Sequence, residues 1–139
     1  TNAILTNANL TGAIFAFATL TDANLADADL TGAILFDADL TGANLTNTDL
    51  TGANLSNADL TGADLTNADL IGTNLSSVIL LGGNWTGANL YGASLPDGYD
   101  QDWFEELGAI FVETVPEAST YALLLGGTVL GYAFWQRRK

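Results

Sequence analysis

The sequence predicts an all-β solenoid, and three observations lead to this prediction. A large apolar residue recurs at every fifth position from Leu5 to Leu95, nineteen times without an insertion. A small residue, usually Ala, stands two positions before each of them, and the residue between the two is mostly Asn or Asp. A period of five residues fits neither an α-helix nor a flat strand. A chain that turns a corner every five residues can point both apolar positions of each unit inward.

The repeated unit, Ala-Asn/Asp-Leu-Thr-Gly, resembles the pentapeptide-repeat family over residues 1–95. The resemblance implies a right-handed quadrilateral β-helix, with one unit on each side and twenty residues in each coil. At a strand spacing of ~4.8 Å, residue n then stacks directly against residue n+20. The large residues form four inner columns, one of which is Leu10, Leu30, Leu50, Leu70 and Leu90.

The second turn position of one corner is occupied by glycine in every coil. Glycine adopts positive φ without steric cost, so we expect turns with a left-handed residue at this position. The glycines concerned are Gly12, Gly32, Gly52, Gly72 and Gly92.

Outward-facing positions carry mostly Thr, Asn and Asp. One outer column is Asn9, Asp29, Asp49, Asp69 and Asn89. Stacked carboxylates repel one another, which suggests cation binding; alternatively, each side chain accepts hydrogen bonds from nearby backbone. A calcium site needs six or more converging oxygens, which a straight column does not supply. We therefore favour the second interpretation and expect neither a metal nor a cofactor.

Some outward positions are apolar instead. Ile14 and Ile34 fall in one column, with Phe17 and Phe36 on the turn positions that follow. A second group breaks the polar pattern later in the repeats: Ile71, Ile79, Leu81 and Tyr91. Exposed apolar groups can mark contact surfaces. Neutral variation on a tolerant scaffold, or cover by the carboxyl-terminal tail, would explain them equally well.

Residues 96–114 are predicted to cap the carboxyl end of the solenoid. The period breaks at Pro96, and the run from Asp102 to Glu105 predicts a capping box that starts a short helix. We expect this helix to continue through Leu107, to stop at Gly108, and to lay Trp103, Phe104 and Leu107 over the last coil. Residues 109–112 would then pair with the edge of that coil. The amino end shows no such cap, so we expect missing upstream residues or self-association through a stacked second copy.

Residues 115–139 are predicted to be a membrane anchor. The stretch 119–135 holds seventeen residues without a charge, the lower limit for one transmembrane helix. Arg137, Arg138 and Lys139 follow it, which places the carboxyl terminus in the cytoplasm and the repeats outside. Gly127 and Gly131 form a small-xxx-small face that could pair two such helices.

The same segment resembles the PEP-CTERM sorting signal. Val115, Pro116 and Glu117 correspond to its recognition motif, although Ala118 stands where a second proline is usual. The resemblance implies export by a Gram-negative bacterium, residence on the extracytoplasmic face of the inner membrane, and sorting to the cell surface by an exosortase-like enzyme. It also implies that an export signal was removed or lies upstream of Thr1.

Composition excludes several classes of function. The chain has sixteen acidic residues, three basic residues, no histidine and no cysteine. Residues 1–136 carry no positive side chain at all, so nucleic acid would be repelled. Without a nucleophile–base pair, an enzyme is not expected. We predict a structural or interaction protein, either self-assembling or an accessory subunit of a membrane complex. The alternative is an acidic rod that mimics DNA and inhibits or protects a type II topoisomerase.

Overall fold

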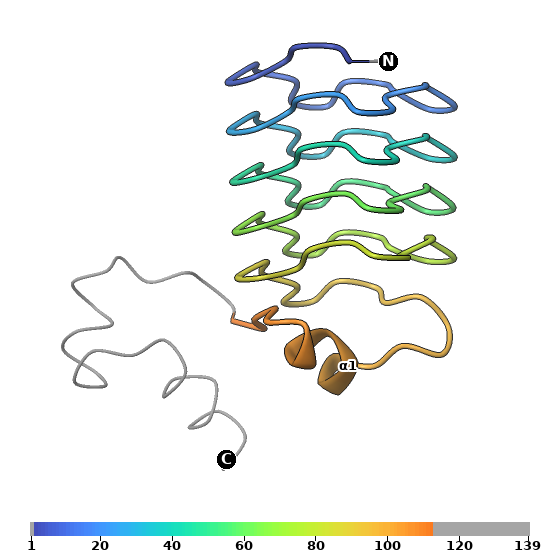
Figure 1. Cartoon of the computed structure of the whole chain (residues 1–139), viewed down its shortest axis with the longest axis vertical. Coiled ribbons are helices and arrows are strands. Elements are labelled where there is room, and N and C mark those ends of the chain that lie inside the picture. Colours follow the sequence, from blue (N-terminus) through green and yellow to red (C-terminus); the bar gives the residue numbers. More distant parts are fainter. Residues whose placement is uncertain (1, 113–139) are drawn as a thin grey trace, which may run out of the picture.

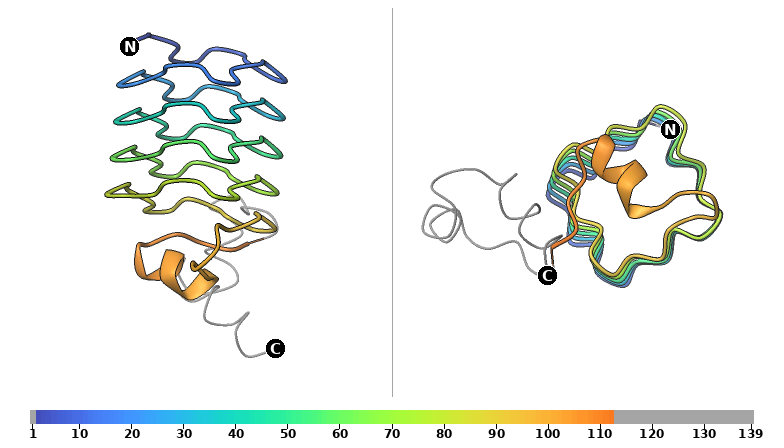
Figure 2. Two further views of the ribbon diagram at one scale, coloured as in Figure 1. Left: turned by 90° about the vertical axis from the view of Figure 1, so that its right-hand side faces the viewer. Right: turned by 90° about the horizontal axis from the view of Figure 1, so that it is seen from below.

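The stacked coils of the solenoid account for most of the structure, a computed structural model that describes residues 2–112. Seen along its axis, each coil has a four-sided outline (Figure 2). Residue n pairs with residue n+20 in single parallel bridges, such as Asn9 with Asp29 and Ile14 with Ile34. The stacking of residue n on residue n+20 is therefore confirmed. We number the sides of the first coil one to four: residues 3–7, 8–12, 13–17 and 18–22; the same numbers apply twenty residues further on.

Two apolar columns from every side fill the interior. Leu25, Leu45 and Leu65 of side one are fully buried, and so are Ala23 and Ala43 two positions before them. Leu5, Leu10 and Phe15 of the first coil are partly buried and pack against the same core. Both apolar positions of the unit thus face inward, as the sequence predicts, and the solenoid has no empty lumen for another segment to enter.

Backbone hydrogen bonds join each coil to the coils on either side of it. On side one, the amide of Asn24 donates to the carbonyl of Ala3 in the coil before (2.8 Å). The next amide, of Leu25, donates to the carbonyl of Asn44 in the coil after (2.8 Å). The carbonyl of Asn24 also accepts from the amide of Leu5, so both backbone groups of Asn24 bond the coil before it. The bonds to the coil after it come from the flanking residues Ala23 and Leu25.

Each corner is a four-residue turn closed by a hydrogen bond, as from the amide of Ala28 to the carbonyl of Leu25 (3.1 Å). Its third residue, Asp27, has a φ of 58°. Positive φ at that place is characteristic of a type II turn. The predicted glycine column shares this conformation, but so do Asn, Asp, Ser and even Phe on other corners. Asn and Asp tolerate it because their short polar side chains bond to local backbone.

Two departures from the repeat are coupled at Trp85. Trp85 replaces Leu in a large column and is fully buried, while Gly83 replaces Ala two residues earlier. A Cβ on Gly83 would lie 3.0 Å from the indole Nε1 of Trp85 and 3.4 Å from the carbonyl oxygen of Ala63. Gly83 does not have positive φ, so it is required here for space rather than for backbone conformation.

The cap begins after Leu95 and contains one short helix, α1 (Gln101–Glu106), which lies across the end of the last coil (Figures 1 and 2). Its N-cap is Asp100, whose carboxylate accepts from the amide of Trp103 at 2.9 Å. The predicted capping box from Asp102 is therefore wrong. Asp100 has extended backbone and so can aim its side chain at the first turn, whereas Asp102 already lies inside that turn.

Aromatic packing holds α1 against the solenoid. Phe104 is fully buried and meets Trp85 edge-to-face, with ring centroids 5.1 Å apart. Trp103 is partly buried and packs against the core, as predicted. The prediction for Leu107 is wrong: this residue is the C-cap of α1 and is exposed. The helix ends at Glu106, one residue earlier than expected, so Leu107 lies outside its last turn.

Residues 109–112 pair with side two of the last coil, as the sequence predicts. The amide of Leu90 donates to the carbonyl of Ile110 (2.8 Å), and the amide of Ile110 donates to the carbonyl of Ala88 (2.7 Å). This segment continues the ladder of side two by one rung. Across residues 2–112, α1 is too short to be a membrane span and no other helix is present. The predicted transmembrane helix over 119–135 lies outside the described residues.

Candidate contact surface

Four apolar side chains gather on side three and the corner that follows it, in the first two coils. Ile14 and Ile34 are bridged partners, and the rings of Phe17 and Phe36 meet edge-to-face with centroids 5.4 Å apart. We call these four residues the apolar corner. Ile14 and Phe17 are 76% and 72% exposed, so neither is explained by burial in the core. The structure thus pairs Ile14 with Ile34 and Phe17 with Phe36 along the same side and corner, while the role of this patch in binding stays a prediction.

The backbone of Phe17 is unusual for an aromatic residue. Its φ is 62°, the left-handed conformation of the third turn residue. The equivalent positions in later coils hold Asp37, Asn57 and Ser77, which have the same conformation but shorter polar side chains. A bulky side chain in this region is disfavoured by contact with the backbone. The sequence carries a signal for this left-handed conformation, because Phe17 falls in a turn position that elsewhere carries Gly, Asn, Asp or Ser.

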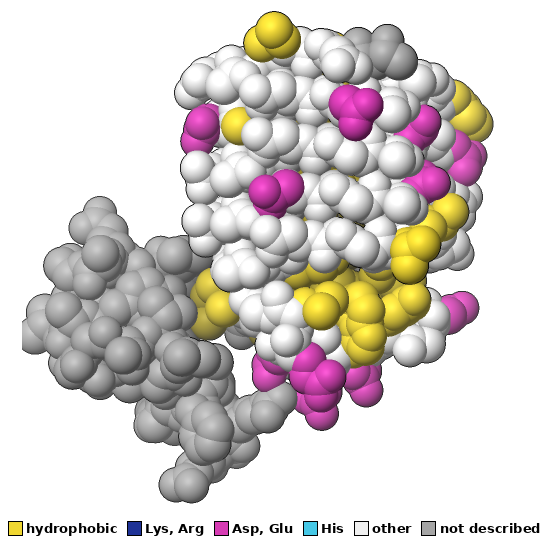
Figure 3. Space-filling view, viewed as in Figure 1, with side chains coloured by type: hydrophobic (Ala, Val, Ile, Leu, Met, Phe, Trp, Pro, Cys, Tyr) yellow, Lys and Arg dark blue, Asp and Glu magenta, His cyan; other side chains and the backbone are white. Residues whose placement is uncertain are grey.

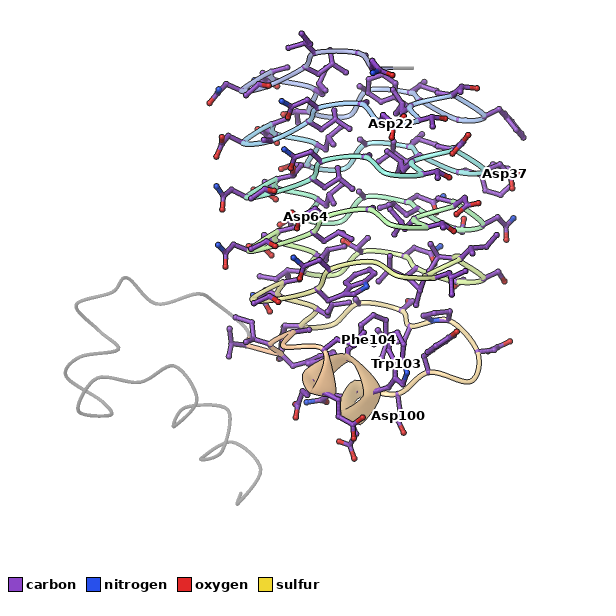
Figure 4. All side chains as sticks on the ribbon, viewed as in Figure 1. Asp22, Asp37, Asp64, Asp100, Trp103 and Phe104 are labelled. Atoms are coloured by element: carbon purple, nitrogen blue, oxygen red, sulfur yellow. The ribbon has the colours of Figure 1, made fainter. Side chains whose placement is uncertain are left out.

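Negative charge borders the apolar corner. Asp37 occupies the same corner one coil below Phe17 and points away from the rod (Figure 4). Figure 3 shows acidic side chains beside and below the hydrophobic group at the upper right. Of the sixteen acidic residues, Glu113 and Glu117 lie beyond the described part, which leaves fourteen acidic and no basic residues in 2–112. The electrostatic potential around the corner is therefore negative.

The aspartate columns bind their own backbone, as the favoured interpretation predicts. Asp29 Oδ1 accepts from the amide of Thr31 (2.9 Å), and Asp39 Oδ1 accepts from the amide of Thr41 (3.0 Å). Donation from the Thr31 amide, then from the Thr31 and Thr11 hydroxyls, lowers the pKa of Asp29. Donation from the Thr41 hydroxyl and amide, then from the Thr21 hydroxyl, lowers the pKa of Asp39. Within residues 2–112, no cluster of acidic side chains has the arrangement of a metal site.

Asp69 behaves differently from Asp29 of the same column. It stacks between Asp49 and Asn89, next to the added rung of the cap. Burial raises the pKa of Asp69, the amide of Ile71 opposes that rise, and the negative charge of Asp49 adds to it. Asp69 therefore occupies a less favourable environment for a charged carboxylate than Asp29, two coils earlier.

The second apolar group does not form one surface. Ile79 and Leu81 lie on side four and its corner, whereas Ile71 and Tyr91 lie on the corner after side two. Sides two and four are on opposite faces of the coil, so proximity in sequence does not bring these residues together. Figure 3 shows hydrophobic side chains over the last coils close to α1. The apolar corner is thus the better-defined candidate.

The remaining predicted site residues lie outside the described part of the chain. These are the proposed sorting motif, the helix-pairing glycines and the basic flank: Val115, Pro116, Glu117, Gly127, Gly131, Arg137, Arg138 and Lys139.

Comparison with known families gives one match, which covers most of the chain. The model described as pentapeptide repeats (8 copies) matches residues 1–35, 38–76 and 68–97. No curated protein matches the chain.

Several solved structures are similar. A pentapeptide repeat protein from the Arabidopsis thaliana thylakoid lumen is 39% identical with a TM-score of 0.68, covering 70% of this chain and 68% of its own. The protein Rfr23 from the cyanobacterium Cyanothece 51142 is 32% identical with a TM-score of 0.61, covering 78% of this chain and 64% of its own. A pentapeptide repeat protein from Nostoc PCC 7120 is 38% identical with a TM-score of 0.57, covering 71% of this chain and 84% of its own.

Proposed function

The chain belongs to the pentapeptide repeat family, and we propose that it is a non-enzymatic interaction protein: an acidic rod held by a carboxyl-terminal anchor on the extracytoplasmic face of a bacterial inner membrane. We base this on one observation above all. The apolar core of the solenoid is complete without residues 119–135, an uncharged stretch that ends in a basic triplet.

The described surface supports binding rather than catalysis. The inner columns fill the rod, and outward carboxylates such as Asp29 and Asp39 accept from neighbouring amides and hydroxyls. Catalysis by acid and base needs groups that converge on a substrate in a pocket. The aspartates here follow straight columns on an outer surface instead. A rigid rod with one exposed apolar corner is suited to holding a partner.

The membrane part of the proposal rests on the sequence of the tail. An apolar stretch of seventeen residues needs either a protein core or a bilayer. The interior of the solenoid is already filled by its own side chains, so a bilayer is the more favourable environment for this apolar stretch. The basic triplet that follows it favours the cytoplasmic side. One similar protein comes from the thylakoid lumen, a compartment bounded by a membrane, which is compatible with repeats on the far side.

Sorting is the second part of the proposal. An exosortase-like enzyme would recognise Val115, Pro116 and Glu117 and transfer the rod to the cell surface. Whether the tail is removed distinguishes a permanent anchor from a sorting signal. Both forms present the rod outside the cytoplasm.

The experiment combines protease access on intact spheroplasts with the intact mass of the protein from the membrane fraction. Digestion of the rod from outside, with residues 119–139 retained in the mass, is the result expected for a stable anchor. Loss of mass after Glu117 would show sorting. Protection of the rod inside intact spheroplasts would overturn the proposed topology. A matched variant replaces Leu124 and Val129 with Asp, which should release the protein from the membrane.

The charge of the rod supports a second candidate, a DNA-mimicking ligand of a type II topoisomerase. Nine aspartates lie within about 4.75 coils, or about 23 Å at strand spacing. That is about one charge per 2.5 Å, compared with one per ~1.7 Å in duplex DNA. The nine are Asp22, Asp27, Asp29, Asp37, Asp39, Asp49, Asp59, Asp64 and Asp69. A supercoiling assay with purified gyrase tests this candidate: inhibition or protection by the rod would favour it, and no effect at excess rod would reject it.

A further inference from the structure

The apolar corner has a feature that folding does not explain. Phe17 combines a disfavoured left-handed backbone with a ring that is 72% exposed. Asn57 and Ser77 show that short polar residues fit the same corner with the same backbone. An aromatic residue here neither suits the turn nor gains much burial. A conflict between local preference and observed conformation is typical of functional positions.

The surroundings of Phe17 make it part of a built surface. Its amide donates to the carbonyl of Phe36 (2.9 Å), and the two rings meet edge-to-face. Ile14 and Ile34 extend the apolar area along side three, where they are bridged to each other. The backbone bonds between the first and second coils fix these positions, so the surface is preorganised. Rigid aromatic side chains are the residues that most often anchor protein interfaces.

Charge identifies the chemistry of the occupant. Asp37 lies on the same corner as Phe17, and the whole of residues 2–112 holds fourteen acidic and no basic side chains. A second copy of this rod would bring like charges together, and an anionic bilayer would be repelled. A partner surface that presents apolar side chains between Lys or Arg residues would complement both the apolar area of the corner and the negative charge around it. Arginine would also gain by packing against an aromatic face.

We propose that the apolar corner docks a partner protein through a segment whose exposed aromatic or aliphatic side chains are flanked by Lys and Arg. This deepens the proposed interaction function, on which it rests, by naming the surface and the partner chemistry. Phe17 is the central contact, Phe36 supports its ring, and Asp37 attracts the basic flank.

The test uses the full chain in detergent and two fluorescein-labelled peptides. Both carry the same Trp-Leu core, flanked by arginines in one and by glutamates in the other. We expect saturable binding of the arginine peptide in fluorescence anisotropy, no binding of the glutamate peptide, and weakening of the former with added salt. Backbone resonances of Phe17 and Phe36 should shift on titration. Failure of the arginine peptide to bind, or equal binding of both peptides, would overturn the proposal.

Three variants separate docking from folding. Phe17→Asn should weaken peptide binding about tenfold or more while raising the melting temperature, because Asn suits the left-handed turn. Asp37→Asn should weaken binding and reduce its salt dependence. Tyr91→Thr removes another exposed ring on a different corner, restores the residue found at Thr51, and should leave binding unchanged. Unchanged binding in Phe17→Asn would contradict the proposal.

Other occupants give distinct results. A rise in mass with concentration that Phe17→Asn abolishes would assign the corner to a second copy instead. Binding of the corner to phosphatidylglycerol vesicles, lost in the same variant, would assign it to a lipid surface. Peptide binding does not depend on the tail, so a protein that binds the peptide but is not held in membranes would refute the anchor alone. A membrane-held protein that does not bind the peptide would refute the docking site alone.

Discussion

The side chain of Asn89 joins the last coil to the cap by bonding both the amide and the carbonyl of Val112. Its side-chain Nδ2 donates to the carbonyl of Val112 (3.0 Å), and its Oδ1 accepts from the amide of Val112 (3.2 Å). Asn89 is only 2% exposed, whereas Asn9 begins the same column in an exposed position. The side chain of Asn89 therefore supplies the two hydrogen bonds that fasten the end of the cap rung.

Asn89→Asp should destabilise the protein by about 2 kcal/mol, because the change removes a buried donor and places a carboxylate against a carbonyl. Urea unfolding measures the free energy of unfolding. Asn9→Asp is the matched control, since the exposed side chain keeps its acceptor for Thr11 and should change stability by less than about 0.5 kcal/mol. Equal effects of the two substitutions would show that the bonds to Val112 contribute nothing.

Gly83→Ala should cost about 1–3 kcal/mol, since its methyl group would press on the Trp85 indole and on the backbone of Ala63. A double-mutant cycle with Trp85→Leu isolates the contact. The same Ala should cost at least ~1 kcal/mol less in the Trp85→Leu background, which restores the ordinary repeat on this side. Thermal unfolding of the four proteins provides the values, and an additive result would contradict the steric coupling.

Asp69→Asn should raise stability at pH 7 by about 0.5 kcal/mol by removing repulsion with Asp49 while keeping an acceptor for the Ile71 amide. Because folding raises the pKa of Asp69, its ionised form opposes folding at neutral pH. The advantage of the variant should shrink as pH falls through that raised pKa and vanish below the ordinary value of 3.8. Asp64→Asn is the control, since its column neighbours Asn44 and Asn84 are uncharged, and it should show a smaller gain.

Lowering the pH should reduce the stability that Asp29 and Asp39 contribute, which is the opposite of its effect through Asp69. Folding lowers the pKa of both, so their stabilising contribution is complete above the ordinary value of 3.8 and is lost as pH falls through the lowered values. Asp39→Asn should therefore melt below wild type at pH 7 and together with it at the acid end of the titration. A difference in melting temperature that stays constant with pH would show that the charge of Asp39 is not involved.

Much of the fold follows from the five-residue pattern. The large and small positions of each unit predict which residues fill the core, and Leu25, Ala23 and their equivalents are buried accordingly. The pairing of residues 109–112 with the last coil was also predictable, because an open β edge needs a partner and an apolar run follows the cap. The N-cap was not: Asp100 and Asp102 are both good capping residues, and only the backbone conformation before the helix selects the first.

The candidate surface was predictable in part. Stacking at a twenty-residue interval predicts the pairing of Ile14 with Ile34, which the structure confirms. Phe17 and Phe36 occupy the turn positions that come next in the sequence. The grouping of Ile79 with Tyr91 failed, because residues twelve apart in a four-sided coil lie on different faces. The turn position of Phe17 follows from the phase of the repeat, but its exposure and the contact between its ring and that of Phe36 needed the structure.

The sequence by itself determined a solenoid with a leucine and alanine interior and polar outer columns, because one short unit repeated in phase allows one way to bury its apolar positions. The tertiary structure decided what happens where that repetition fails. Gly83 is explained by the ring of Trp85 together with the carbonyl of Ala63 in the coil before, the burial of Asn89 by the cap, and the ring contact of Phe17 by Phe36 of the next coil. Each depends on contacts between coils or with the cap, and no local pattern encodes those contacts.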